Sequence, residues 1–341
     1  MTPSGTGPVE AWLERRPIMP TLEASSATAG DNHEKFRRLV ERAQREAPAV
    51  TAIVHPCDKV SLESAVEAAR LKLITPILVG PREKIEHAAA EAGIDTGGLE
   101  IVDAAHSHDA AAKAVGLVRE GRAEALMKGS LHTDELMSAV VARETGLRTE
   151  RRISHCFIMD VPGHPDALII TDAAVNIAPD LKVKIDIVQN AIDLAHAMGV
   201  AEPRVAILSA METINPDVPS TLEAAALCKM TDRGQITGGV LDGPLALDNA
   251  ISMEAAAVKR IVSSVAGRAN VLVVPDLEAG NMLAKSLSFL AGADAAGIVL
   301  GARVPIILTS RADLLLTRLA SCAVALLLVA AGRANASGAI P

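Results

Sequence analysis

The sequence predicts an α/β protein built from parallel sheets in two domains. A chain of 341 residues is too long for one ordinary core and suits two. Half of the residues are apolar, yet they include only three Phe, one Trp and no Tyr, so Ala, Val, Ile and Leu must fill the interior. This favours β-branched strands and Ala/Leu helices over an aromatic-rich sandwich. Strands also alternate with helices along the chain, as in right-handed βαβ units.

The first regular series of elements begins at Phe36. The residues before it are rich in Pro, Gly, Ser, Thr and Ala without a sustained period, so we expect a flexible leader over residues 1–35. Amphipathic runs then predict helices, and short β-branched runs predict strands. The predicted order is helix 36–46, strand 49–55, helix 61–72, strand 74–80, helix 82–93, strand 99–104, helix 107–121 and strand 123–129.

A second series begins near Arg152. Strands 153–161 and 167–173 are close in sequence, which predicts antiparallel neighbours. The remaining predicted elements are helix 180–198, strand 204–209, helix 219–232, strand 237–243, helix 252–264, strand 270–275, helix 280–291, strand 295–301 and strand 304–309. No repeat of fixed period is present.

The stretch 314–331 is apolar enough to resemble a membrane span, but Arg318 lies inside it. Thr317, Ser321 and Cys322 dilute it further, and it directly follows a strand that ends in polar residues. We therefore predict a buried C-terminal helix that packs on a sheet, and no membrane association. Because this helix and the Ala-rich surfaces offer much apolar area, a homodimer is also expected.

Charge and cysteine usage narrow the class of protein. The net charge of −8 argues against nucleic-acid binding, although a few arginines can still form a local anion pocket. Four widely spaced cysteines without a CxxC motif are typical of a reduced, cytoplasmic protein. Charged residues at 10 and 14–16 interrupt the apolar core that an export signal would need.

The loop after strand 123–129 is the first candidate binding site. Small residues and free N–H groups at a helix start favour an anion, and Lys128 adds a charge. An ordinary βα turn with a capping hydroxyl remains the alternative. The candidate residues are Lys128, Gly129, Ser130, His132 and Thr133. Neither a Walker loop nor a G-x-G-x-x-G fingerprint is present.

Other strand-end loops carry residues that suit either a turn or a ligand contact. These candidates are Asp172, Asn176, Asp242, Gly243, Pro244, Gly280 and Asn281. Asp242, Asp248 and Asp276 together raise the alternative of a metal site, but each lies in turn-forming sequence without a histidine. His132 and His155 do not predict a hydrolase triad, because the G-x-S-x-G elbow is missing.

The last predicted strand ends in a concentrated set of polar side chains. In "VPIILTSRAD" (residues 304–313) an apolar run is followed by Ser310, Arg311 and Asp313.

Five strings in this order resemble the phosphate acetyltransferase/phosphate butyryltransferase family: "MKGSLHT", "TDAAVNI", "LDGPLALDNAIS", "DLEAGNMLAKSL" and "PIILTSRAD". The resemblance covers about residues 36–331, and the S-R-A-D string is closer to the butyryl-type branch. It implies reversible transfer of a short-chain acyl group, acetyl or butyryl, between CoA and inorganic phosphate. CoA is then a substrate, no cofactor or metal is needed, and a homodimer is usual.

The resemblance also implies a fold of the isocitrate/isopropylmalate dehydrogenase-like type, with two domains and a cleft between them. Residues 36–151 with 297–341 would form the first, discontinuous domain, and residues 152–296 an inserted second domain.

Family chemistry assigns roles to the three polar residues after the last strand. Arg311 would neutralise the phosphate through its planar fork, and Ser310 would hydrogen-bond the thiol sulfur or the oxyanion. Asp313 would take the thiol proton, or else cap the final helix.

The chain departs from the acetyl branch at two positions. That branch has its catalytic Asp where Thr317 stands, and an arginine near Met137, for which Arg148, Arg151 or Arg152 would compensate. Two alternatives therefore stay open: a metal-dependent dehydrogenase of the same gross fold, and a non-catalytic CoA-binding or partner subunit.

Overall fold

The computed structural model describes residues 33–309 and 313–337, so the predicted leader lies almost entirely outside it. Within these residues, one sheet has the strand order β3-β2-β1-β4-β11-β10-β5-β6-β9-β7-β8. The strands are β1 (Ala49–Val54), β2 (Ile74–Gly80), β3 (Glu100–Asp103), β4 (Ala125–Lys128), β5 (Ser154–Asp160), β6 (Leu168–Thr171), β7 (Arg204–Leu208), β8 (Val240–Leu245), β9 (Val271–Val273), β10 (Asp294–Leu300) and β11 (Ile306–Ile307).

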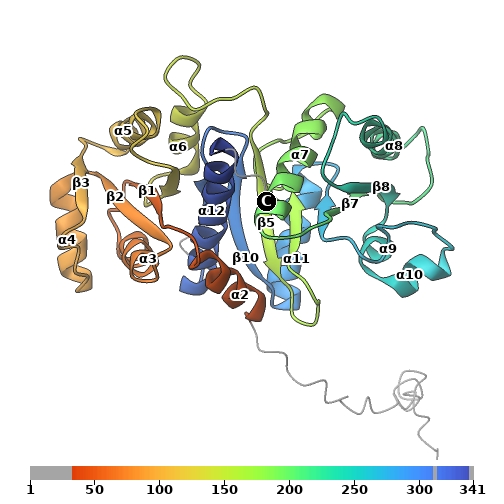
Figure 1. The fold of residues 1–341 in the computed structure, drawn as a ribbon, viewed down its shortest axis with the longest axis horizontal. Coiled ribbons are helices and arrows are strands. Elements are labelled where there is room, and N and C mark those ends of the chain that lie inside the picture. The colour runs from red at the N-terminus through yellow and green to blue at the C-terminus, as the bar shows by residue number, and fades with distance from the viewer. Residues whose placement is uncertain (1–32, 310–312, 338–341) are drawn as a thin grey trace, which may run out of the picture. The chain divides into compact units, whose positions relative to one another are not determined.

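Helices cover both faces of this sheet (Figure 1). They are α2 (Glu34–Ala43), α3 (Lys59–Arg70), α4 (Arg82–Ala92), α5 (Ser107–Arg119), α6 (Thr133–Val140), α7 (Leu181–Ala197), α8 (Pro219–Asp232), α9 (Leu247–Ile251), α10 (Met253–Val258), α11 (Leu277–Ala291) and α12 (Leu315–Ala336). The predicted alternation of strands and helices is confirmed.

The sheet contains two parallel blocks that point in opposite directions. β3, β2, β1, β4 and β11 pair in parallel and form the first block. β6, β9, β7 and β8 pair in parallel and form the second block. Between them, β10 is antiparallel to both β11 and β5, and β5 is antiparallel to β6, as predicted for that pair. The carboxyl ends of the two blocks therefore face opposite edges of the sheet.

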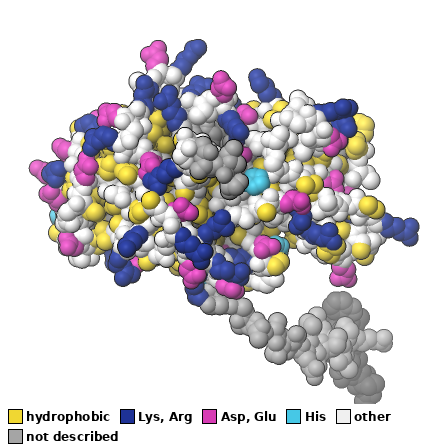
Figure 2. Space-filling view, in the orientation of Figure 1, with side chains coloured by type: hydrophobic (Ala, Val, Ile, Leu, Met, Phe, Trp, Pro, Cys, Tyr) yellow, Lys and Arg dark blue, Asp and Glu magenta, His cyan; other side chains and the backbone are white. Residues whose placement is uncertain are grey.

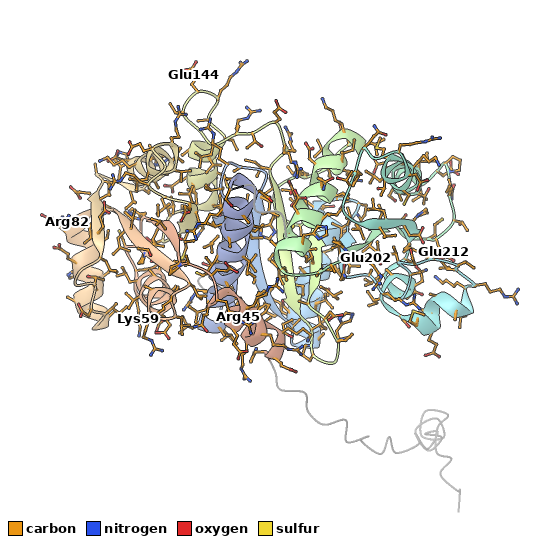
Figure 3. All side chains as sticks on the ribbon, in the orientation of Figure 1. Arg45, Lys59, Arg82, Glu144, Glu202 and Glu212 are labelled. Atoms are coloured by element: carbon orange, nitrogen blue, oxygen red, sulfur yellow. The ribbon has the colours of Figure 1, made fainter. Side chains whose placement is uncertain are left out.

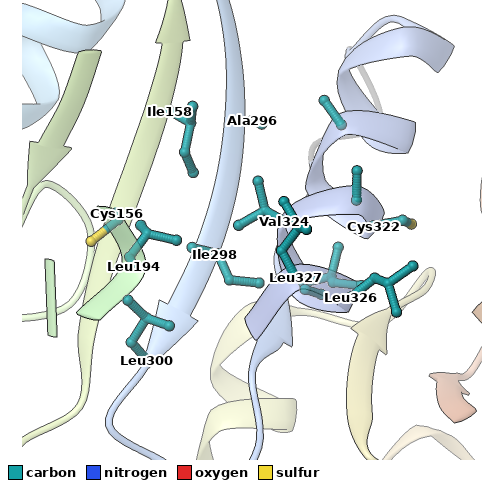
Figure 4. Close-up of a cluster of buried hydrophobic side chains, with 14 of the residues drawn as sticks. Cys156, Ile158, Leu194, Ala296, Ile298, Leu300, Cys322, Val324, Leu326 and Leu327 are labelled. Atoms are coloured by element: carbon teal, nitrogen blue, oxygen red, sulfur yellow. The ribbon is translucent and has the colours of Figure 1, made fainter. Parts of the chain in front are cut away.

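The apolar C-terminal helix is buried at the centre of the molecule. Figure 4 shows Val324 and Leu327 of α12 beside Ile298 of β10, and these residues belong to one buried cluster with Cys322 and Leu326 of α12 and Cys156 of β5. Although α12 is long and apolar enough for a membrane span, 67% of its most apolar window is buried here. Burial of this apolar surface stabilises the sheet where the two blocks meet.

The polar residues of α12 have partners inside the protein. The Ser321 hydroxyl accepts a hydrogen bond from the Gly297 N–H of β10 (3.1 Å) and donates one to Thr317 O (3.2 Å). Near the end of the helix, the Arg333 guanidinium pairs with Glu124 and donates to the carbonyls of Ala47 and Pro48. These contacts fix the position of α12 against the first block.

Several predicted boundaries differ from the structure. α2 starts at Glu34, inside the predicted leader, and Lys35 forms an ion pair with buried Asp160 (2.7 Å). The predicted helix 252–264 ends at Val258, since Arg260 adopts a left-handed φ of 56°. The predicted strand 304–309 pairs only at Ile306 and Ile307.

Candidate active site

The carboxyl ends of three adjacent strands, β1, β4 and β11, converge on one small pocket. Thr309, at the end of the β11 segment, borders the pocket directly before the S-R-A-D residues. The N-terminal turns of α3 and the first turn of α12 complete the wall. The lining residues are Asp58, Val60, Ser61, Ser64, Lys128, Gly129, Thr309 and Arg318.

Gly129 fixes how the β4 loop lies against the β1 loop. A Cβ at this position would stand 2.5 Å from Val54 O and 2.7 Å from His55 O. The Gly129 N–H instead donates to Val54 O (2.9 Å), and the Ser130 N–H donates to His55 O (2.9 Å). Because both blocking atoms belong to the backbone, only glycine fits, and this close approach holds Lys128 at the pocket.

Ser130 ties the two loops together through its side chain. Its hydroxyl donates to His55 O (2.7 Å), accepts from the Cys57 N–H (3.3 Å) and lies 3.0 Å from His55 Nδ1. Burial, with Lys84 nearby, lowers the pKa of His55, and burial raises the pKa of the Cys57 thiol to about 11. At neutral pH neither side chain carries charge, so the formal charges near this end of the sheet come from other residues.

The α3 N-terminus contributes hydroxyls and a carboxylate to the pocket. Asp58 caps the helix by accepting from the Ser61 N–H (2.8 Å), and the Ser61 hydroxyl donates to the same carboxylate oxygen (2.6 Å). The Ser64 hydroxyl donates to Val60 O (2.6 Å). Lys59, next to the cap, is exposed and lies at the outer surface (Figure 3).

Arg318 was missed by sequence reasoning, which treated it only as a charge that interrupts an apolar helix. Its residue is 5% exposed and it lines the pocket opposite Lys128. Nη1 donates to Asp313 O (3.0 Å) and Nη2 lies 3.4 Å from Glu63. A buried arginine within a long apolar run was the available signal.

The β6 loop brings four other candidates together, but mainly through contacts among themselves. Asp172 is 2% exposed and accepts from the N–H groups of Ala174, Val175 and Asn176. Asn176 donates to Ile153 O (2.9 Å) and to Asp172 (2.6 Å). These contacts fit the turn-forming alternative, and ligand roles for Asp172 and Asn176 stay predictions.

The start of α11 packs against the same loop. A Cβ on Gly280 would stand 2.9 Å from Ala173 Cβ, and Asn281 Nδ2 lies 3.4 Å from Ala173 O. Val175, in turn, packs against the buried cluster that also receives Met137 and Leu308. The β6 loop therefore packs against α11 and against this cluster, and most of its polar groups are already satisfied.

Asp242, Gly243 and Pro244 do not join these residues. They lie inside β8 and not at a strand end, and β8 is the outermost strand of the second block. Asp242 accepts from the Gly243 N–H (2.8 Å), Asp248 pairs with Lys259 (3.4 Å), and Asp276 caps α11. Among the residues described, no three His, Cys, Asp or Glu side chains form a group that could hold a metal.

The comparisons with known proteins decide the family. The model of the phosphate acetyl/butaryl transferase family matches residues 105–326. The chain is 68% identical to a phosphate acetyltransferase of Rhizobium meliloti, over 90% of this chain and 97% of that protein. It is 40% identical to a phosphate butyryltransferase of Clostridium acetobutylicum, over 86% and 97% of the two chains.

A solved structure agrees with the sequence relatives. A branched-chain phosphotransacylase from Enterococcus faecalis V583 has a TM-score of 0.72 at 31% identity, over 82% of this chain and 99% of that chain.

The chain belongs to the phosphate acetyl/butyryl transferase family.

The S-R-A-D string of this family member directly follows Thr309, a residue of the pocket wall. Ser310 and Arg311 lie outside the described residues, between Thr309 of the pocket wall and Asp313. Leu314, and not Asp313, is the N-cap residue of α12, and it makes no side-chain cap bond. Thr317, at the position of the acetyl-branch Asp, is 4% exposed and is not part of the pocket wall.

None of the remaining predicted residues that the structure describes lines this pocket. His132 and Thr133 are exposed at the start of α6, and His132 makes no side-chain cap bond. Arg151 pairs with Asp193 and lines a separate surface pocket of about 510 Å³, so it does not supply charge at Lys128. Neither Arg148 nor Arg152 lines the Lys128 pocket. His155 lies buried against Phe157, with ring centroids 4.4 Å apart.

Proposed function

We propose that the chain is a phosphate acyltransferase that moves a short-chain acyl group between CoA and inorganic phosphate. The observation that carries the proposal is the position of Thr309, the residue that directly precedes the family string 310–313. Thr309 lies in the wall of a pocket that also contains Lys128 and Arg318. A pocket with two cationic side chains at a helix N-terminus suits a phosphate group.

The proposed reaction proceeds in a ternary complex. Arg311 binds the phosphate, and Ser310 stabilises the thiol sulfur or the oxyanion of the transition state. Asp313 takes the thiol proton when CoA attacks the acyl phosphate, and it returns the proton in the reverse direction. CoA is a substrate here, and we propose that neither a cofactor nor a metal takes part.

The acyl group is proposed to be acetyl. The S-R-A-D string resembles the butyryl-type branch, but identity is higher to the named acetyltransferase than to the named butyryltransferase. Thiol release from acetyl-, propionyl-, butyryl- and isobutyryl-CoA, with phosphate and with a chelator present, tests the proposal. We expect chelator-resistant activity that is highest with acetyl-CoA; no activity with any of these donors would overturn the enzymatic function.

Arg311→Ala tests the assigned phosphate role. Its KM for phosphate should rise far more than its KM for acyl-CoA, and Lys at this position should restore only part of the loss, since an ammonium lacks the bidentate fork. The expected loss in kcat/KM is about 30- to 1,000-fold. A variant with lower thermal stability and an unchanged phosphate KM would instead indicate a structural role.

The two-domain organisation is part of the proposal. Residues 36–151 with 297–341 would form one domain and 152–296 the other, as in isocitrate/isopropylmalate dehydrogenase-like folds. The reversal of strand direction around β10 and β5 supports a division there. Limited proteolysis should cleave near residue 151 before it cleaves within either proposed domain, whereas residue 296 lies inside β10 and should be protected.

We also propose a cytoplasmic homodimer. α12 is largely buried within the described part of this chain, which leaves little of it for an interface, whereas α11 exposes Met282, Phe289 and Leu290 (62%, 85% and 87%). Contiguous exposed apolar side chains of this size favour a protein contact. Light scattering should give a dimer mass, and Phe289→Glu should lower it; a monomeric wild type would contradict the proposal.

A further inference from the structure

The buried guanidinium of Arg318 is only partly compensated. Its contact with Glu63 is long, at 3.4 Å, and the Glu63 side chain is 42% exposed, so much of that charge remains in water. The second contact is to a neutral acceptor, Asp313 O. Burying a charge without a close counter-charge lowers the free energy of unfolding.

One donor of Arg318 is left over. Nε is buried and has no hydrogen-bond partner among the described residues. Leaving a buried charged donor unsatisfied destabilises a protein more than an average hydrogen bond stabilises it. A bound ligand would satisfy Arg318 Nε if one of its oxygens accepted this hydrogen bond.

The surroundings of Arg318 specify the charge of that ligand. Lys128 lines the same pocket, and the N-terminal turns of α3 lie in its wall. Asp58 also lies in the wall, where its carboxylate accepts hydrogen bonds from the Ser61 N–H and hydroxyl. Lys128, Arg318 and Asp58 together leave one net positive charge, which favours an anion at the positive end of the α3 dipole. Figure 2 shows acidic and basic side chains interspersed over the face in view.

We infer that Arg318 binds the phosphate group in this pocket. The inference rests on the proposed function and adds a residue to it. Through Nη1, Arg318 also ties α12 to Asp313 by a hydrogen bond to the Asp313 carbonyl.

Steady-state kinetics with a matched arginine control test this role. Arg333 lies on the same helix, pairs with Glu124 and donates to two carbonyls, but it does not line the pocket. Arg318→Gln should raise the KM for phosphate about 10- to 100-fold, the loss of one charge-assisted contact. Its KM for acyl-CoA should change less than about threefold, and Arg333→Gln should change neither KM.

The KM for acyl-CoA shows whether Arg318 binds inorganic phosphate or a phosphate group of CoA. A rise in the KM for acyl-CoA as large as that for phosphate would place a CoA phosphate at Arg318 and overturn the inference. A phosphate KM that stays within about threefold of the wild-type value would overturn it as well.

Glu63→Gln tests the role of the Arg318 charge without removing Arg318, because it neutralises the carboxylate that pairs with this guanidinium. If Arg318 binds phosphate, removing its competing carboxylate should lower the KM for phosphate by about twofold or more. An unchanged or higher KM would contradict the inference. This variant also keeps the test valid if Arg318→Gln does not fold.

Thermal unfolding with added inorganic phosphate separates this inference from the proposed function. Phosphate should raise the Tm of the wild type and of Arg333→Gln, but much less that of Arg318→Gln. If the wild type shows this shift but no acyl transfer, the proposed function fails and the inference stands. If acyl transfer occurs and the shift is equal in all three proteins, the inference fails and the function stands.

Discussion

The two parallel blocks of the sheet use the same kinds of residues for different purposes. In the first block, the ends of β1, β4 and β11 bring Lys128, Gly129 and Arg318 around a shared pocket. In the second block, Asp172 and Asp276 accept hydrogen bonds from their own loop or helix start. A polar residue at a strand end is therefore a stronger binding candidate where its side chain lines a pocket than where it only caps its own loop or helix.

The largest loss of stability is expected at Gly129, where the β4 loop lies against the backbone of the β1 loop. Gly129→Ala should lose about 3 kcal/mol or more of stability, because its Cβ would overlap two backbone oxygens that cannot move independently. The matched control is Gly116→Ala in α5, where nothing lies within 4 Å of the added Cβ. That control should gain about 0.5–1 kcal/mol. Urea unfolding measures both, and equal stabilities would refute the close-packing argument.

The next prediction concerns the second block. Asp172→Ala removes the acceptor of three backbone N–H groups and of the Asn176 side chain, so it should lose about 2–4 kcal/mol of unfolding free energy. If the residue only builds its loop, the KM values of the folded fraction should stay near those of the wild type. A large rise in KM without loss of stability would instead support the predicted ligand role.

Substitution of Lys128 should reduce activity and not stability, the reverse of the result expected for Asp172→Ala. Lys128→Met is expected to lower kcat/KM about 10- to 100-fold, since it removes a charge from the pocket, and to leave the Tm nearly unchanged. Lys59→Met is the control, because this exposed lysine lies close in sequence to the pocket residues but does not line the pocket. Equal activities of the two variants would remove Lys128 from the binding site.

The smallest effect is a pH dependence at the junction of the blocks. Burial lowers the pKa of His155 to about 4 in the folded protein, from an ordinary value of 6.5. The unfolded chain therefore binds the proton first, and stability is lost as the pH falls from 6.5 toward 4. His155→Gln should lose less stability than the wild type between pH 7 and pH 5 in urea unfolding; equal losses would show that other groups dominate.

Local patterns predicted the elements well, because β-branched and Ala-rich runs directly reflect burial on a sheet or a helix face. The insertion of β11 between β4 and β10 left no such pattern, since pairing of Ile306 with Leu126 depends on residues far apart in sequence. For the same reason the opposite directions of the two blocks were not predicted, and Asp242 was grouped with strand-end residues.

Only those parts of the candidate site whose residues are adjacent in sequence could be predicted. The loop at Lys128 and Gly129 was identified from small residues after a strand, and the structure places both in the pocket. Arg318 was not identified, because its proximity to Lys128 depends on how α12 packs across the sheet. Asp172 was ambiguous in the sequence, and its hydrogen bonds explain why: turn formers and ligand contacts share the same residue types.

The position of β11 and α12 has a consequence for protein synthesis. β11 is the strand that bridges the first block to β10, and α12 fills the core at that junction. β11 and α12 are synthesised after all the other strands, so the nascent chain holds two partial sheets with exposed apolar faces until residues 306–336 have emerged from the ribosome. We therefore expect the growing chain to depend on chaperones up to that point, and ribosome-stalled chains that end before residue 304 to remain sensitive to protease.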